Sequence, residues 1–522
     1  MNEPAQPALK AQRGLLKSSG VVSAMTMLSR VFGLARDMVI AYFFGSSAGA
    51  DSFFLAFRIP NFFRRLFGEG AFSQAFVPVL TEYRSKRTAE EVKDLVDKVS
   101  GTLGVNLVII TLLGVVGAQV VISIFAAGFV YNGQAEKLDL ATDMLRLTFP
   151  YLMLISLTAF AGGILNSFGR FAIPAFTPVL LNLSLILCAV YLRPWLETPV
   201  MALAWAVLIA GVAQLTFQLP FLARIDLLPR PKVDFKDEGV RKILTLMLPA
   251  LFGVSVGQIN LLLDTVLASF LETGSLSWLY YSDRLLELPL ALFGITIATV
   301  ILPSLSREHA DESPQEFGKT LDWAIRMVFL IGVPASIALV LLSESLITTL
   351  FYQGEMTRRD VTMASLSLGA YGVGLLGHML VKVLAPGYFS RQDTATPVRY
   401  GIVALVSNMI LNLILIWHLK HAGLALATSI SAFINAGLLW YGLGRAGVLI
   451  KVPGWAKFAG QVIIASVAMC VVLVLLTPEQ QRWFEMAFWE RFGAMLLICI
   501  GGVVTYAAFL FMSGFRPRQM VR

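Results

Sequence analysis

Apolar stretches of about twenty residues recur along the whole chain, separated by charged residues or by Pro and Gly. A helix of about twenty apolar residues spans the hydrocarbon core of a bilayer, so each stretch predicts one transmembrane helix. The fold class that follows is an all-α polytopic membrane protein with fourteen spans. The predicted spans are residues 15–44, 52–80, 100–125, 141–166, 174–192, 199–222, 243–270, 277–305, 322–350, 361–388, 397–417, 422–442, 458–476 and 492–514.

The composition agrees with this class. Of the 522 residues, 57% are hydrophobic and 14% are charged, whereas soluble domains have about 25% charged residues. The formal net charge is +8, but in a membrane protein the distribution of charge over the loops matters more than its total. We therefore expect no nucleic-acid partner. The three cysteines lie in apolar runs, which predicts neither a disulfide framework nor a thiolate metal site.

Lys and Arg are concentrated in alternate connections between the spans, which predicts that both termini lie in the cytoplasm. The two halves of the chain also resemble each other at a constant shift: Gly49, Ser52, Pro78 and Leu80 recur as Gly274, Ser277, Pro303 and Leu305. A repeat of six spans predicts two parallel six-helix bundles. The predicted parts are an N-terminal bundle (1–222), a basic cytoplasmic linker (223–242), a C-terminal bundle (243–446) and two further helices (447–522).

Charged residues inside the predicted spans are the main functional signal. Insertion of Arg or Asp at a helix centre costs about 2.5–3.5 kcal/mol, so such residues are expected to face water, a partner or an anion. The first two spans are rich in Arg, and the spacing of seven between Arg30 and Asp37 places them on one helix face. Asp51, Arg58 and Arg65 follow the same spacing in the second span. The candidate substrate-binding residues are Arg30, Arg36, Asp37, Asp51, Arg58, Arg64, Arg284 and Glu287.

Two interpretations of these charges remain open. Guanidinium groups bind phosphate and pyrophosphate through paired hydrogen bonds, so a cationic cavity for an anionic phospho-substrate is the functional interpretation. Structural ion pairs, or arginines that reach the membrane surface, are the alternative. Pro60 and the pair Gly68 and Gly70 interrupt the second span beside Glu69, which indicates a bend where backbone groups meet a polar cavity.

A second group of polar residues lies in the seventh, eleventh and twelfth spans. Asp264 stands alone in apolar sequence, Asn408 and Asn412 lie one turn apart, and Thr428 follows in the next helix. Carboxylate, amide and hydroxyl oxygens suit a hard cation, so a sodium site is one interpretation. The other is that these groups hydrogen-bond neighbouring helices together.

Long motifs around the charged positions connect the chain to a known family. They are SRVFGLARD at 29–37, PNFFRR at 60–65, GEGAFSQAFVP at 68–78, YYSDRL at 280–285 and APGYFSRQD at 385–393. In these motifs, and over essentially its whole length, the chain resembles the MurJ (MviN) family of lipid II flippases, which belongs to the MOP exporter superfamily.

The resemblance implies a multi-pass protein of the bacterial cytoplasmic (inner) membrane that is a transporter and not an enzyme. Such proteins carry the undecaprenyl-pyrophosphate-linked peptidoglycan precursor, lipid II, from the inner to the outer leaflet by alternating access. Membrane lipids and the cell-wall synthesis machinery are the other partners it suggests. In that family the charged positions that match Arg30, Arg36, Asp37, Asp51, Arg64, Arg284 and Glu287 are needed for function.

The resemblance also assigns roles to residues that the spacing alone does not. Glu69, with Gly68 and Gly70, matches a portal motif, and the last two helices match a groove for the polyprenyl tail. Some members bind sodium at positions that match Asp264, Asn408, Asn412 and Thr428. Others have Asn at the first of these positions and Asp at the third, so coordination by this chain is an expectation and no other cofactor is implied.

Three alternatives remain at this stage. A multidrug exporter on the same scaffold would favour acidic and aromatic cavity residues, and the excess of arginine argues against it. A membrane-embedded glycan polymerase would need an acid or base on a sizeable outer loop, and the outer loops are short. A scaffold for cell-wall enzymes would tolerate substitution of the charged residues.

Overall fold

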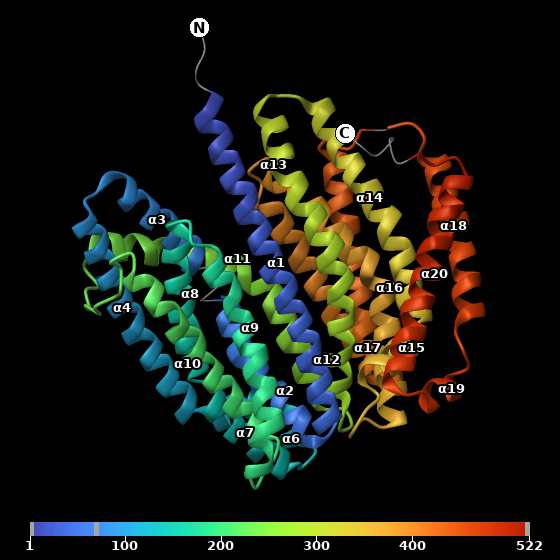
Figure 1. The fold of residues 1–522 in the computed structure, drawn as a ribbon, viewed down its shortest axis with the longest axis horizontal. Helices are drawn as coiled ribbons and strands as arrows, with labels where there is room; N and C mark the ends of the chain where they lie inside the picture. The colour runs from blue at the N-terminus through green and yellow to red at the C-terminus, as the bar shows by residue number, and fades with distance from the viewer. Residues whose placement is uncertain (1–4, 67–71, 451, 517–522) are drawn as a thin grey trace. The chain divides into compact units, whose positions relative to one another are not determined.

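The computed structural model describes residues 5–66, 72–450 and 452–516. Within these residues the chain forms helices and no β-strand (Figure 1). Ten helical stretches, of which Ala135–Ser167, Ala172–Trp195 and Ser275–Ala310 each extend beyond a single helix named below, are long and apolar enough to cross a membrane. The all-α polytopic fold class is thereby confirmed. The helices are α1 (Ala5–Phe44), α2 (Ala48–Phe63), α3 (Phe72–Lys86), α4 (Ala89–Val116), α5 (Ala118–Phe125), α6 (Ala127–Tyr131), α7 (Ala135–Thr148), α8 (Tyr151–Ser167), α9 (Ala172–Leu187), α10 (Met201–Ala223), α11 (Glu238–Ser269), α12 (Ser275–Pro289), α13 (Thr296–Ala310), α14 (Pro314–Leu341), α15 (Ser343–Phe351), α16 (Arg358–Phe389), α17 (Ala395–Arg445), α18 (Trp455–Leu476), α19 (Gln480–Glu485) and α20 (Phe488–Met512).

The count of fourteen spans stays a prediction, although the described residues of every predicted span fall largely on helices. Helix α17 holds two of the predicted spans, because Lys420 in its middle has φ 50° and ψ −130° and the chain changes direction there. The ten membrane-length helices therefore account for eleven predicted spans. The other three, 15–44, 52–80 and 243–270, coincide with α1, with α2 and α3, and with α11, which include the helices richest in predicted site charges.

The chain divides into two compact units, residues 1–270 and 271–522. In the first unit α1 packs against α9, α2 against α7, and α8 against α10, while α11 packs against α3, α4, α5 and α6. This unit therefore ends one helix later than the predicted N-terminal bundle. In the second unit α16 packs against α12, α14 and α17, and α18 and α20 pair with each other beside α14 (Figure 1).

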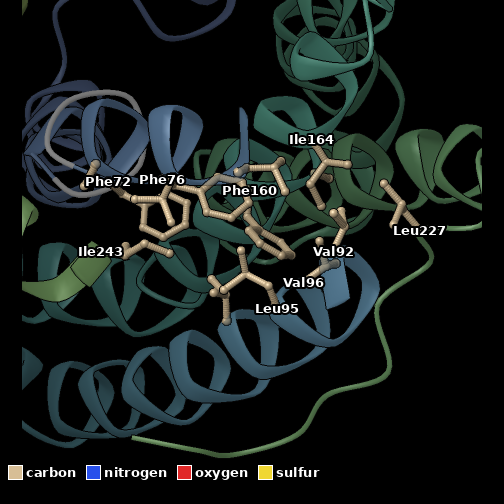
Figure 2. Packing of buried hydrophobic residues seen from close by; sticks show 14 of the residues in the cluster. Phe72, Phe76, Val92, Leu95, Val96, Phe160, Ile164, Leu227 and Ile243 are labelled. Carbon is tan, nitrogen blue, oxygen red and sulfur yellow. The ribbon is translucent and has the colours of Figure 1, made fainter. Parts of the chain in front are cut away.

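A buried aromatic and aliphatic cluster joins several helices of the first unit (Figure 2). Phe72 and Phe76 of α3 pack on Phe160 of α8, with the ring centres of Phe76 and Phe160 5.0 Å apart. Helix α4 and the start of α11 add Leu95 and Ile243. Leu227, from the segment before α11, also belongs to the cluster, so the connection 224–237 is fixed to the body of this unit.

Candidate functional site

Arg36 of α1, one of the predicted substrate-binding arginines, is held by two side chains. Its Nε and Nη2 donate hydrogen bonds to Oδ1 of Asp37 at 2.9 and 2.7 Å, and its Nη1 donates to Oδ1 of Asn182 at 2.9 Å. Arg36 is 6% exposed and Asp37 2%. The spacing of seven grouped Asp37 with Arg30, but the structure pairs Asp37 with its neighbour Arg36. Arg30 itself is half-buried.

Asn182 is a residue that the sequence analysis missed. It lies in α9, which packs along α1, and its Nδ2 donates to the carbonyl oxygen of Ser29 at 3.0 Å. A single Asn in an apolar helix gives no signal in the sequence, because an amide can equally serve any neighbouring helix. Only the packing of α9 on α1 identifies its partner.

Asp51 lies in the first turn of α2, which Ser47 caps by accepting a hydrogen bond from the backbone N–H of Ala50 at 3.2 Å. Its carboxylate is paired with the ammonium of Lys137 from α7, at 3.3 Å. Lys137 also lies over the ring of Phe129, 4.3 Å from its centre. Sequence analysis missed Lys137 as well, because it precedes its predicted span and looked like an ordinary loop residue.

The remaining arginines of the first unit lie further along α2. Nη1 of Arg58 donates to the hydroxyl of Thr265 in α11 at 2.8 Å, which places Arg58 next to the residue that follows Asp264. Nε of Arg64 donates to Oδ1 of Asn61 at 3.1 Å. Beyond Phe63 the backbone widens into a π-helical turn at residues 64–66, so the regular helix ends where Pro60 and the glycines predicted a bend. Gly68, Glu69 and Gly70, the predicted portal, lie outside the described residues.

In the second unit Arg284 and Glu287 of α12 form the ion pair that their spacing predicts, at 2.8 Å. The guanidinium also lies over the ring of Tyr280, 5.0 Å from its centre. The side chains are 30% and 42% exposed, in contrast to the buried Arg36 and Asp37 pair. A partly exposed guanidinium is accessible to a further acceptor, and guanidinium groups bind carboxylate and phosphate oxygens alike.

The polar residues of α17 form a short hydrogen-bonded chain. Nδ2 of Asn412 donates to Oδ1 of Asn408 at 2.8 Å, and Nδ2 of Asn408 donates to the hydroxyl of Thr428 at 3.3 Å. Both asparagines are fully buried. Two amide oxygens and a hydroxyl fit the ligand chemistry of sodium. The bond from Asn408 to Thr428 also joins the two halves of α17, which meet at Lys420. Asp264, the fourth predicted ligand, is half-buried in the first unit.

Clusters of three or more His, Cys, Asp or Glu that could hold a metal ion are absent from the part of the chain that the structure describes.

The segment 224–237 is fastened to α4 by charges that the sequence did not connect. The carboxylate of Asp97 accepts the backbone N–H of Arg230 at 2.7 Å, and its carbonyl oxygen accepts the N–H of Lys232 at 3.0 Å. The ammonium of Lys98 is 2.8 Å from carboxylate oxygens of both Asp94 and Asp237. The predicted basic linker thus has acidic partners on α4, and we name this set of contacts the α4 clasp.

Two carboxyl groups at this end of the unit have lowered pKa values. Burial raises the pKa of Asp237, but the ammonium of Lys98 and the N–H groups of Val240 and Gly239 outweigh it, so the pKa lies below its ordinary value of 3.8. The pKa of Glu82 is lowered by its hydrogen bond to Lys242, at 2.6 Å, and by Lys86. Both groups are therefore ionised at neutral pH and hold α11 to α3 and α4.

Comparison with known proteins places this arrangement in a family. A family model described as lipid II flippase MurJ matches residues 40–492. A probable lipid II flippase MurJ of Vibrio cholerae is 52% identical over 511 residues, which are 97% of each chain. A lipid II flippase MurJ of Burkholderia cenocepacia is 42% identical and covers 87% of this chain, with 89% of its own length.

Solved structures agree in fold. A lipid II flippase MurJ in an inward closed conformation has a TM-score of 0.78 and 26% identity, and the match covers 96% of this chain and 99% of the other. An inward-facing multidrug resistance MATE transporter of the MOP superfamily has a TM-score of 0.66 at 16% identity, with coverage of 83% and 99%, and shares the fold alone. By sequence over nearly its whole length, this chain belongs to the lipid II flippase MurJ family.

Proposed function

We propose that this chain moves lipid II from the inner to the outer leaflet of the bacterial cytoplasmic membrane by alternating access. The observation that carries the proposal is the 52% identity to a probable lipid II flippase across 97% of both chains. Arginine chemistry in each unit supports it: Arg36 is held by Asp37 and Asn182 in the first unit, and Arg284 is held by Glu287 in the second.

The chemistry follows from what a guanidinium binds. Arg36, Arg58, Arg64 and Arg284 each present planar N–H donors, and a pyrophosphate offers paired oxygens that match them. Asp37 and Glu287 hold two of these guanidinium groups until the substrate competes for the same N–H groups. A substrate can shift the conformational equilibrium only by binding one state more tightly, so the diphosphate must gain contacts in the state that it favours.

The proposal also includes the number of membrane spans, their grouping into bundles and the side of the membrane on which the termini lie. Fourteen spans, two parallel bundles with two extra helices, and both termini in the cytoplasm are supported by the helix positions and by the distribution of Lys and Arg. The chain acts as a transporter without a catalytic step. Membrane lipids surround it, and the cell-wall synthesis machinery supplies and consumes its substrate.

Sodium is the proposed coupling ion, with Asn408, Asn412 and Thr428 as ligands from α17 and Asp264 as the candidate carboxylate. The ion would supply positive charge that favours one conformation of the empty carrier. In the structure the three α17 side chains bond to one another. Asn408 donates to Thr428 in the second half of α17, and Asn412 donates to Asn408 within the first half.

A multidrug exporter is not favoured as an alternative. The MATE transporters share the fold at 16% identity or less, whereas the flippases share sequence over the whole chain. Their likeness therefore concerns architecture and not substrate.

The test is outer-leaflet exposure of lipid II in cells depleted of their own flippase. The native chain, Arg36→Ala, Arg284→Ala and Arg146→Ala are compared at matched membrane levels. Arg146 is the control, because it forms an ion pair with Asp143 at the same i,i+3 spacing as Arg284 and Glu287 but has no predicted role. We expect the native chain and Arg146→Ala to restore exposure and the other two variants to fail. Absence of exposure with the native chain would refute the proposed substrate.

A further inference from the structure

Asn182 uses both ends of its amide on α1. Oδ1 accepts from Nη1 of Arg36 at 2.9 Å, and Nδ2 donates to the carbonyl oxygen of Ser29 at 3.0 Å. Ser29 and Arg36 are seven residues apart and so lie on one face of the helix. The amide is 5% exposed. One buried side chain of α9 therefore fixes two points of α1, of which one is a main-chain atom and the other is the guanidinium.

The motif around these residues accommodates the amide. Gly33 lies between Ser29 and Arg36, and a β-carbon at Gly33 would come 3.7 Å from Nδ2 of Asn182. That distance is an ordinary van der Waals contact, so the amide lies directly against the helix face at Gly33. The glycine thus gives the Asn182 side chain its place on the helix face that carries Arg36.

The choice of an amide has an electrostatic consequence. Asp37 already places a carboxylate on the Nε and Nη2 side of Arg36. An amide oxygen on Nη1 orients the guanidinium but adds no negative charge, whereas a carboxylate at position 182 would strengthen the contact and repel an approaching diphosphate. An aliphatic residue would remove the contact and leave a buried N–H of a charged group without its acceptor.

We propose that Asn182 is a positioning residue for Arg36: it fixes the guanidinium for an anionic diphosphate without adding a second negative charge to that of Asp37. This inference rests on the proposed function, because the diphosphate is that of the proposed substrate. Asn182 acts through Arg36 and needs no contact with substrate itself.

Gln214 provides a matched control within the same unit. It is 2% exposed in α10, its Nε2 donates to the carbonyl oxygen of Thr177 in α9 at 2.9 Å, and its Oε1 accepts from the hydroxyl of Tyr151 at 3.3 Å. Gln214 is thus an amide that joins helices in the way that Asn182 does, but it bonds Thr177 and Tyr151 and not an arginine. Replacement of either amide by a carboxylate removes one N–H donor, and with it the hydrogen bond to the main-chain carbonyl of Ser29 or of Thr177.

The experiment compares Asn182→Asp, Asn182→Leu, Gln214→Glu and Gln214→Leu with the native full-length protein in lipid nanodiscs. Thermal unfolding and the dissociation constant for lipid II are measured on each. We expect Asn182→Asp to unfold no earlier than Gln214→Glu, since it gains a charge-assisted bond to Arg36, and to bind lipid II about tenfold more weakly. Asn182→Leu should lose both stability and affinity. The Gln214 variants should lose stability alone.

Native affinity in Asn182→Asp, or an equal loss of affinity in Gln214→Glu, would overturn the inference, because Asn182 would then serve only to join helices. A second probe, undecaprenyl pyrophosphate without sugar or peptide, separates this from the proposed function. If the native protein binds that probe but not lipid II, the substrate assignment fails. The inference about Asn182 then stands or falls with the affinities of the Asn182 and Gln214 variants for undecaprenyl pyrophosphate. If it binds neither, both the function and the inference are refuted.

Discussion

The ammonium of Lys137 lies 3.3 Å from a carboxylate oxygen of Asp51, and both side chains are more than nine-tenths buried. A buried ion pair of this kind is expected to matter most when one member is removed. The remaining charge then stays buried without this partner, and breaking a buried pair in this way costs about 3–5 kcal/mol.

We therefore predict that Lys137→Met lowers the free energy of unfolding by about 3–5 kcal/mol, and that Asp51→Leu in the same chain restores most of the loss. Denaturant unfolding of the purified protein in detergent measures both. Lys86→Met is the control: Lys86 pairs with Glu82 at 3.3 Å on the surface, and its loss should change the unfolding free energy by less than about 1 kcal/mol. An additive double variant would contradict direct coupling between Asp51 and Lys137.

Arg58 gives the second prediction. Its bond to Thr265 is a hydrogen bond to a charged group, for which about 1.5–3 kcal/mol is typical. Thr265→Val keeps the shape of the side chain and removes the acceptor, so it should destabilise the first unit by about that amount and release the Arg58 side chain. Thr142→Val is the control, since the Thr142 hydroxyl bonds the backbone of its own helix in the same way. Equal unfolding free energies for the two variants would mean that the Arg58 contact contributes nothing.

The hydrogen-bonded residues Asn408, Asn412 and Thr428 of α17 could bind sodium or could only join helices, and salt-dependent unfolding distinguishes the two roles. If Asn408 and Thr428 hold sodium, sodium chloride should raise the unfolding temperature of the native protein above the value in equal potassium chloride. Thr428→Val should abolish this difference. A ligand at 100 times its dissociation constant stabilises by about 2.7 kcal/mol, which a thermal scan detects easily. Identical unfolding temperatures in the two salts, over the full range of concentration, would leave the helix contact as the role of this group.

The helices were predictable from the sequence because hydropathy depends on each segment alone. Even the turn inside α17 was predictable, since His418, Lys420 and His421 interrupt the apolar run where Lys420 adopts its unusual φ of 50°. The ion pair of Arg284 and Glu287 is also of a kind that spacing can predict, because its members lie three residues apart on one helix.

Contacts between helices were not predictable in the same way. Arg36 and Asn182 are 146 positions apart, and Asp51 and Lys137 are 86 apart. Periodicity tells which face of a helix carries a residue but not which distant helix packs there. For the same reason the acidic residues of α4 gave no sign that they fasten the segment 224–237.

Asp237 makes part of the α4 clasp dependent on pH. Its carboxylate caps α11 by accepting from the N–H groups of Gly239 and Val240, and it pairs with Lys98. Its pKa is lowered in the folded protein, so its contribution to stability is fully present above the ordinary value of 3.8 and is lost as the pH falls through the folded-state pKa.

We predict that Asp237→Asn, which keeps a cap but loses the charge, is less stable than the native protein at pH 7. The difference should shrink as the pH is lowered below about 4. Asp237→Ala should be less stable than Asp237→Asn by about 1 kcal/mol at every pH, because it also loses the cap. Unfolding midpoints between pH 7 and pH 3 measure both effects. A difference between native and Asp237→Asn that grows on acidification would reverse the assigned sign.

The close approach of the segment 224–237 to α4 gives the last prediction. A β-carbon at Gly101 would lie 2.2 Å from the carbonyl oxygen of Lys232, which is a main-chain atom, whereas one at Gly104 would meet nothing within 4 Å. Alanine is favoured over glycine by about 1 kcal/mol in a helix, so Gly104→Ala should stabilise α4. Gly101→Ala has the same intrinsic gain but must push the segment away, and it should therefore destabilise the protein.

Hydrogen exchange gives the local readout. The backbone amides of Arg230 and Lys232, both bonded to Asp97, should exchange faster in Gly101→Ala and at the native rate in Gly104→Ala. Equal protection in the two variants would mean that the segment does not rest on α4 in solution.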